Sequence, residues 1–409
     1  MSGHAPNMRR HLPLLLGSLL FAASCQTPAP DYGRSLPPGW PALLKVTSAT
    51  EWPDLSRDWR HREELLPALD RSIEWFATQS SQKFYPIEGV THERAYASVT
   101  RFRELLMQCH SAYSFRWSVE NEFNLYKSAG WDGRGGGVLF TAYCTPIFDG
   151  CLTQSDEFSH PLYGTPADLV KGEAGSILGR VTEAGLMEPY PTRQAIEAGG
   201  LLEGRGLELV WLTSPMDAFI AHVNGSAFVR LPDGDMARFG YGANNGHEYT
   251  SLGRELVEAG ELEEERLSLP AIRAWARENS ESVMAYLQRN DRYVFFSEIE
   301  GNPSGSLGFE VTANRTLATD KSIFPRGGMT YVDTPAGWAK MRSGASVHQT
   351  LMDQDTGGGI RTAGRADIYL GIGDDAEALA GDTLAEGQLY YLFLREDLLS
   401  DSSSWGAEG

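Results

Sequence analysis

Apolar and polar residues alternate along the segment 365–370, which predicts a β-strand. Its apolar residues would face a core, while Arg365, Asp367 and Tyr369 would share the opposite face. Asp367 is therefore expected on a strand. Taken alone, such an aspartate is about as often a solvated charge at a sheet edge as a functional group, so its surroundings must decide.

Other periodic segments predict a mixture of helices and short strands. Apolar residues recur at helical spacing from Arg60 to Phe76, and Thr91 is placed to cap a second helix. The segment 232–235, PDGD, lies between two apolar runs and predicts a β-hairpin. Later helices are expected at 252–259, 269–278 after Ser268, and 281–289 after Ser280. Short strands with glycine and proline follow from Tyr293 to Leu394, which favours a barrel over a helical bundle.

Composition narrows the possible functions. The chain has 409 residues, 42% of them hydrophobic, which is enough for two globular domains. It carries 35 basic and 54 acidic residues, so the formal net charge is -19. This balance disfavours nucleic-acid binding and broad contact with anionic lipid.

The N-terminus has the features of an export signal. Arg9 and Arg10 precede a short apolar segment, and Cys25 follows small residues. That order predicts a lipoprotein-like signal peptide over 1–25 with acylation of Cys25; simple secretion is the alternative. Residues 26–40 are rich in proline and polar groups and are expected to form a tether.

The other cysteines do not predict a metal site. Cys109, Cys144 and Cys151 allow at most one intramolecular disulfide, for which Cys144 and Cys151 are the nearest pair. No pair of cysteines or histidines has zinc-ligand spacing, so we expect no metal and no cofactor.

Several separated blocks resemble the membrane-bound lytic murein transglycosylase A family (MltA). They occur in matching order between about Trp40 and Leu394. The blocks are FTAYCTP from Phe140, YPTRQAIEAG from Tyr190, VNGSAFVRLPDG from Val223, GYGANNGHEYTSLGREL from Gly240, LPAIRAWARENS from Leu269, NDRYVFF from Asn290 and QDTGGGIRTAGRADIYLGIGDDAEALAG from Gln354.

The resemblance implies a mainly β fold with helices. Its catalytic part would be a double-psi β-barrel (3D domain) formed by 41–145 and 291–397. A β-rich domain, 146–290, would be inserted, leaving a substrate groove between the two. Residues 398–409 would be a mobile tail.

The resemblance also implies the reaction and the residues that carry it. The expected enzyme is a peptidoglycan lytic exotransglycosylase, which cleaves the β-1,4 bond after N-acetylmuramic acid and leaves a 1,6-anhydro ring. Asp367 takes the place of the acid and base, and Asp355 that of a second groove carboxylate. The expected substrate-binding residues are Thr141, Tyr143, Asn224, Ser226 and, in the GIGDD segment, Asp374. The expected protein is a monomer that acts on glycan strands and is lipid-anchored at the outer membrane facing the periplasm, or periplasmic without the anchor.

Two blocks depart from the family pattern. FTAYC has Ala142 and Cys144 in place of glycine and tyrosine, and NGSA has Asn224 and Ala227 in place of glutamine and glycine. These changes touch sugar-binding positions and leave both aspartates intact. They affect the expected subsite preference more than the expected reaction.

The chemistry leaves alternatives open. Asp367 must be protonated when substrate binds, which needs a raised pKa, whereas Arg365 on the same face would lower it. We therefore expect Arg365 to turn to another acceptor. An aspartic protease would need a second DTG, which the chain lacks. A water-using glycosidase with Asp355 and Asp367 as its pair, and a cell-wall binder without activity, both remain.

Overall fold

A computed structural model describes residues 1–3, 30–172, 176–334 and 346–399 of the chain. From Asp31 onward the chain forms one compact unit, separate from Met1–Pro30. The expected acylation site, Cys25, lies outside the described residues. No helix in the described ranges is both long and apolar enough to cross a membrane.

The larger sheet closes into a barrel. Its eight strands follow the order β1-β2-β17-β14-β15-β13-β16-β3, and a further pairing of β17 with β3 closes a ring of six strands. The pairs β13–β15 and β16–β3 are parallel, and the other pairs are antiparallel. The strands are β1 Leu43–Lys45, β2 Phe123–Ser128, β3 Val138–Thr145, β13 Thr316–Ala318, β14 Met329–Asp333, β15 His348–Asp355, β16 Arg365–Ile372 and β17 Ala385–Leu394.

The middle of the chain forms two smaller sheets. One has the order β12-β11-β10-β4-β9-β5, and the other is β6-β7-β8. The predicted hairpin is confirmed, because β10 and β11 pair in antiparallel fashion around it. The strands are β4 Ile147–Cys151, β5 His160–Tyr163, β6 Leu169–Lys171, β7 Ile177–Val181, β8 Met187–Glu188, β9 Glu208–Leu212, β10 Ala227–Arg230, β11 Met236–Asn244 and β12 Val294–Glu298.

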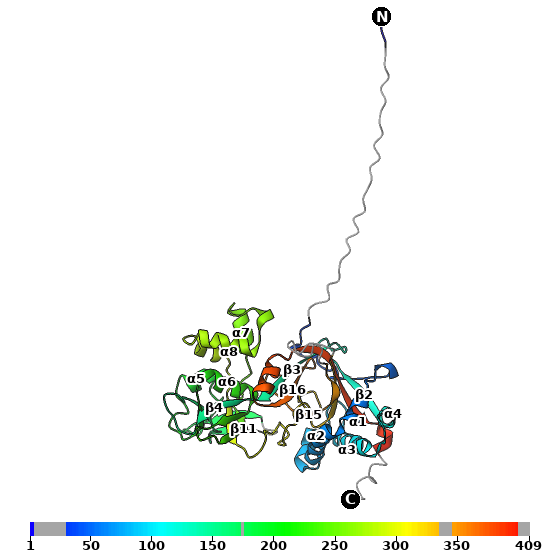
Figure 1. The fold of residues 1–409 in the computed structure, drawn as a ribbon, viewed down its shortest axis with the longest axis horizontal. Helices are drawn as coiled ribbons and strands as arrows, with labels where there is room; N and C mark the ends of the chain where they lie inside the picture. Colours follow the sequence, from blue (N-terminus) through cyan, green and yellow to red (C-terminus); the bar gives the residue numbers. More distant parts are fainter. Residues whose placement is uncertain (4–29, 173–175, 335–345, 400–409) are drawn as a thin grey trace. The chain divides into compact units, whose positions relative to one another are not determined.

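Some helices pack against the barrel, and others belong to the inserted region. In Figure 1, helices α1 and α2, from the N-terminal part of the chain, lie beside strand β15, from its C-terminal part. The helices are α1 Ser56–Arg60, α2 Arg62–Phe76, α3 His92–Gln108, α4 Ala112–Glu122, α5 Arg193–Glu197, α6 Pro215–Asn224, α7 Leu252–Glu258, α8 Leu269–Glu278, α9 Val283–Leu287 and α10 Asp374–Gly381. Short 3-10 turns occupy Ala49–Glu51, Gln79–Phe84 and Glu264–Arg266.

Side-chain caps explain where several helices begin. Thr91 and Ser268 accept hydrogen bonds from the backbone N–H groups three residues ahead, as the sequence predicts. The last expected helix is shorter than predicted: α9 begins at Val283 after Ser282, so Ser280 does not cap it.

Separate apolar clusters support the barrel and the inserted region. The larger one joins barrel strands with α2 and α3, and includes Phe102, Phe140 and Leu392. The second surrounds α6 and the middle sheet. Leu398 and Leu399, within the expected tail, pack against the larger cluster, whereas 400–409 lie outside the described residues.

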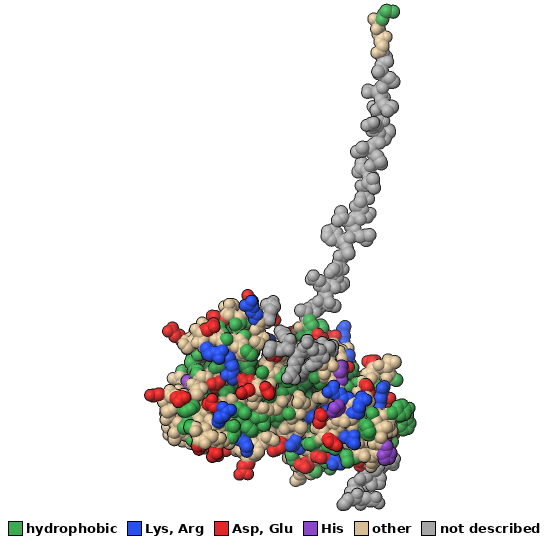
Figure 2. Space-filling view, viewed as in Figure 1, with side chains coloured by type: hydrophobic (Ala, Val, Ile, Leu, Met, Phe, Trp, Pro, Cys, Tyr) green, Lys and Arg blue, Asp and Glu red, His purple; other side chains and the backbone are tan. Residues whose placement is uncertain are grey.

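The structure also shows the state of the cysteines and the distribution of surface charges. Cys109, Cys144 and Cys151 are all free, so the candidate Cys144–Cys151 disulfide is not formed. On the face drawn in Figure 2, Lys and Arg side chains are scattered among Asp and Glu side chains.

Candidate active site

Asp367 lies on a barrel strand that is paired on both sides. Its strand, β16, pairs with β3 on one side and with β13 on the other, so that Asp367 is opposite Thr141 and Ala318. The side chain is partly buried, and its Oδ1 has no hydrogen-bond partner in the described part of the chain. Burial raises the pKa of Asp367 to about 6, with a smaller contribution from the charge of Asp355. The prediction that Asp367 lies on a strand is confirmed, and its raised pKa is in the direction that an acid role requires.

Arg365 does not neutralise this carboxyl directly. Its Nη2 donates to Thr141 Oγ1 at 3.3 Å, and the described residues include no ion pair between Arg365 and Asp367. The guanidinium still acts on Asp367 at longer range, because its charge and the Thr141 hydrogen bond both lower the pKa of the carboxyl. Burial outweighs both effects. The expectation that Arg365 turns to another acceptor is confirmed.

Asp355, at the end of β15, is held by donors on both carboxyl oxygens. Its Oδ2 accepts from the Tyr143 hydroxyl at 2.6 Å. Its Oδ1 accepts from the backbone N–H groups of Ser306 at 2.9 Å and Thr356 at 2.8 Å. Burial raises the pKa of Asp355, while these three hydrogen bonds stabilise the ionised form and oppose that rise.

A chain of hydroxyl groups links the barrel to the inserted region. The rings of Tyr143 and Tyr369 are 5.2 Å apart, and the Tyr369 hydroxyl is 3.1 Å from Thr145 Oγ1. Thr145 Oγ1 is in turn 3.1 Å from Oγ of Ser226, which is buried. The Ser226 hydroxyl is therefore used in a contact between the barrel sheet and the inserted region.

Asn224 ends helix α6 and contacts the barrel. Its Oδ1 accepts from the backbone N–H of Cys144 at 3.3 Å, and its Nδ2 donates to Ile220 O at 2.9 Å. Gly225 follows at φ 72°, a conformation that favours glycine and allows the chain to leave the helix. Asn224 and Ser226 thus fix the edge of the inserted region against β3.

A cavity of about 460 Å³ opens beside Thr141. Its barrel side includes Thr141, Ala142 and Cys144, and its other side is formed by α6, α7 and α8. Burial raises the pKa of the Cys144 thiol to about 12, so this thiol stays protonated and acts as an apolar wall. The apolar side chains in the wall include Met216, Phe219, Ile220, Val223, Leu252, Leu267, Leu269 and Ile272.

The glycines after Asp355 pack against two residues that the sequence did not single out. A Cβ on Gly358 would lie 2.9 Å from Arg292 Nε, and one on Gly359 would lie 3.1 Å from a ring carbon of Tyr249. The loop therefore needs glycine for close packing. Arg292 and Tyr249 lie within two of the matched blocks, but nothing in their local pattern marks them as neighbours of this loop.

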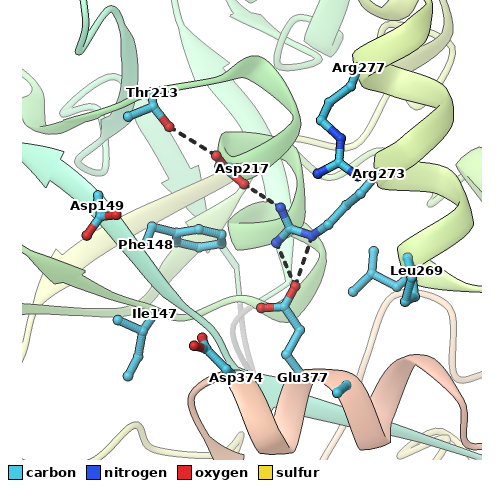
Figure 3. A pocket seen from close by; sticks show the side chains of 12 residues that line it. Ile147, Phe148, Asp149, Thr213, Asp217, Leu269, Arg273, Arg277, Asp374 and Glu377 are labelled. Carbon is cyan, nitrogen blue, oxygen red and sulfur yellow. Dashed lines mark hydrogen bonds and ion pairs between the residues drawn. The ribbon is translucent and has the colours of Figure 1, made fainter.

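Asp374 lies apart from the other expected groove residues. It begins α10 and lines a second cavity of about 480 Å³ with Arg273 and Glu377 (Figure 3). The structure thus brings Thr141, Tyr143 and Asp355 near Asp367, and places Asp374 elsewhere. Within the described ranges, no three His, Cys, Asp or Glu side chains are grouped to hold a metal ion.

Comparisons with protein families identify two matched regions. Residues 139–297 match the family model described as the MltA specific insert domain, and residues 315–393 match the 3D domain. The chain is 33% identical over 267 residues to membrane-bound lytic murein transglycosylase A of Vibrio cholerae, and 32% identical over 250 residues to that of Escherichia coli K12. These matches include 63% and 60% of this chain, and 66% and 63% of the relatives' lengths.

Solved structures share the fold. A membrane-bound lytic murein transglycosylase from Agrobacterium tumefaciens superposes with a TM-score of 0.72 at 27% identity, covering 87% of this chain and 99% of that one. Escherichia coli MltA with bound chitohexaose gives a TM-score of 0.64 at 24% identity, covering 90% and 97%. The fold class expected from the sequence is confirmed.

Proposed function

This chain belongs to the membrane-bound lytic murein transglycosylase A family, and from that premise we propose that it is a lytic transglycosylase of peptidoglycan. It cleaves the β-1,4 bond between N-acetylmuramic acid and N-acetylglucosamine. The muramic acid is released as a 1,6-anhydro sugar. The observation that carries the proposal is the Asp367 carboxyl, with its pKa of about 6 and one oxygen that has no hydrogen-bond partner among the described residues.

Asp367 acts first as an acid and then as a base. The protonated carboxyl donates its proton to the glycosidic oxygen, and the bond from that oxygen to C1 breaks. The 6-hydroxyl of the same muramic acid attacks C1, and the Asp367 carboxylate accepts the hydroxyl proton. Because the attacking group is already tethered, orientation can lower the barrier by about 7–11 kcal/mol without a second nucleophile.

Asp355 supports this step by position and charge. Both its oxygens accept hydrogen bonds from Tyr143, Ser306 and Thr356, so they are poorly placed to activate a water molecule. This favours the one-carboxyl reaction over hydrolysis by an aspartate pair. The negative charge of Asp355 also helps to keep Asp367 protonated.

The sugar-binding surface extends from Asp367 along β3. Thr141 lines the cavity beside it, together with Asn224 from the inserted region. Tyr143 is hydrogen-bonded to Asp355 within the barrel, and Ser226 joins the inserted region to the barrel through Thr145. The apolar wall of this cavity suits the faces of sugar rings, and its polar groups suit their hydroxyls.

The proposal includes a place in the cell envelope and a domain plan. The protein is a monomer anchored by a lipid on Cys25 at the outer membrane, with its catalytic part in the periplasm. The sequence places the catalytic barrel at 41–145 and 291–397 and the inserted domain at 146–290. Because β12 (Val294–Glu298) pairs with β11 in the middle sheet, we move the second boundary to the end of β12. The export-type N-terminus and the membrane-bound relatives support the anchor, and the separation of the barrel sheet from the two sheets of the middle region supports the plan.

One substitution tests the assignment of Asp367. Asp367→Asn keeps the shape of the side chain and removes its acid, so release of fragments from purified sacculi should fall at least about 100-fold while binding to sacculi persists. The matched control is Asp375→Asn, an exposed aspartate on α10, which should retain wild-type release. Substantial release by the Asp367→Asn protein would overturn the assignment.

A further inference from the structure

The cavity that contains Asp374 is distinct from the cavity beside Thr141. Its volume is about 480 Å³, within the range of small-molecule sites. Figure 3 shows its walls coming from β4, α6, α8 and α10. Its lining residues are Ile147, Phe148, Asp149, Thr213, Asp217, Leu269, Pro270, Arg273, Arg277, Asp374, Glu377 and Ala378.

An ion-pair network organises one wall of this cavity. Arg273 Nη1 lies 2.6 Å from Asp217 Oδ1, and its Nη2 lies 2.6 Å from Glu377 Oε1. The pairs join α8 to α6 and to α10, and all three side chains are largely shielded from solvent. Arg273 is thus fully engaged by two carboxylates, and the three side chains together keep one net negative charge.

Two further charges in the cavity have no such partner. Arg277 on α8 and Asp374 on α10 make no hydrogen bond or ion pair within the described part of the chain. Figure 3 shows them on different sides of the cavity, with the ring of Phe148 on a third side. A ligand lying between them would meet a cation, an anion and an apolar surface.

The balance of charge indicates what kind of ligand fits. The lining contains four carboxylates, Asp149, Asp217, Asp374 and Glu377, and two guanidinium groups, so it is negative overall. One of the carboxylates, Asp149, is already paired outside the cavity with Arg230. A group with an ammonium near Asp374 and a carboxylate near Arg277 matches this arrangement, whereas a simple anion does not.

The two cavities are adjacent. Leu269 and Glu377 line both, so the Arg273 network separates this cavity from the one beside Thr141. Along β3 and β4, Thr141 is six residues from Ile147, which is at most about 20 Å at the rise of a strand. An extended peptide of five residues spans about 17 Å. The two lengths are comparable, so a peptide on the sugar in the next position along the strand, which lies closer to this cavity, falls within reach of it.

We propose that this cavity binds the peptide stem of peptidoglycan, at an amino acid residue that carries a free ammonium and a free carboxylate. The inference rests on the proposed function and deepens it, because it makes peptide-bearing glycan the preferred substrate. Asp374 then belongs to the stem site and not to the sugar groove. A stem whose ammonium is consumed by a cross-link binds less well.

The test compares two substrates with the full-length protein in detergent. One is sacculus-derived glycan with its stems, and the other is the same glycan after an amidase has removed them. For each protein we take the ratio of kcat/KM on the first substrate to kcat/KM on the second. Wild type should show a ratio of at least about five, and Arg277→Gln and Asp374→Asn should each lower it about fivefold, as expected for the loss of one ionic contact.

Matched controls separate this effect from a general change of charge. Asp375→Asn removes a neighbouring exposed charge from α10, and Arg266→Gln removes an exposed charge close to α8; neither residue lines the cavity. Both should keep the wild-type ratio. A wild-type ratio of one, or equal losses on both substrates in the Arg277 and Asp374 variants, would overturn the stem site. Absence of anhydro products from wild type on either substrate would instead overturn the proposed function.

Discussion

Burial is the physical origin of the central residue's behaviour. Asp367 lies in the barrel wall, where desolvation raises the pKa of its carboxyl to about 6 despite the nearby Arg365. Arg365 does not reverse this because its Nη2 is directed to Thr141. This raised pKa is what the proposed acid role requires, and it comes at some cost to the stability of the fold.

The pH dependence of activity follows from this pKa. The proposed reaction begins with a protonated Asp367, so kcat/KM should fall as the pH rises through about 6, with a slope of one proton. A pH–rate profile on soluble glycan strands measures it. A kcat/KM that rises between pH 5 and pH 8 would contradict the acid role.

The same pKa predicts how stability changes with pH. The pKa of the Asp367 carboxyl is 3.8 in the unfolded chain and about 6 in the folded protein. This carboxyl therefore has no effect on the free energy of unfolding below pH 3.8, and it lowers that free energy as the pH rises through about 6. Asp367→Asn should therefore be more stable than wild type at pH 8, by on the order of 2–3 kcal/mol, with little difference at pH 4. Denaturant unfolding at both pH values measures this. An equal change at both values would rule out titration of Asp367 as the cause.

At the scale of elements, the sequence predicts helix caps and tight turns, but it does not predict contacts between residues that are far apart in the chain. Thr91, Ser268 and the 232–235 turn act through neighbours a few residues away, so the sequence predicts them well. The contact between Tyr143 and Asp355 joins residues 212 positions apart and requires the parallel pairing of β3 with β16. No local pattern encodes such a pairing.

The position of Asp374 shows how an element can end unexpectedly. Gly371 and Gly373 adopt φ values of 111° and 89°, and the register between β16 and β3 shifts between Tyr369 and Ile372. The alternation that places Asp367 is lost there, and α10 begins at Asp374. The strand alternation predicted for 365–370 therefore gives no guide to Asp374, whose expected role came from the family resemblance.

The Arg273–Glu377 pair should couple α8 to α10 energetically. Its side chains are 27% and 15% exposed, compared with 53% and 65% for the surface pair Arg230–Asp149. A double-mutant cycle with Arg273→Gln and Glu377→Gln should give a coupling free energy of about 1 kcal/mol, larger than that of the surface pair. Equal coupling in the two cycles would show that the network does not hold these helices together.

At the scale of the whole molecule, the barrel and the inserted region contribute different parts of the proposed site. The barrel supplies Asp367 and Asp355, and the inserted region supplies Asn224 and Tyr249. The order of the matched blocks predicted the fold class and the two aspartates. It did not predict Tyr249 and Arg292 beside the glycine loop, because such packing depends on how two sheets meet.

The most direct test of the whole account is the chemistry of the product ends. Purified sacculi are digested with the wild-type protein and with Asp367→Asn, and the soluble fragments are analysed by mass spectrometry. The account predicts 1,6-anhydromuramic acid ends from wild type and almost no fragments from Asp367→Asn, because the tethered 6-hydroxyl replaces water and Asp367 supplies the proton. Fragments with reducing ends would show that water is the nucleophile and would contradict the account.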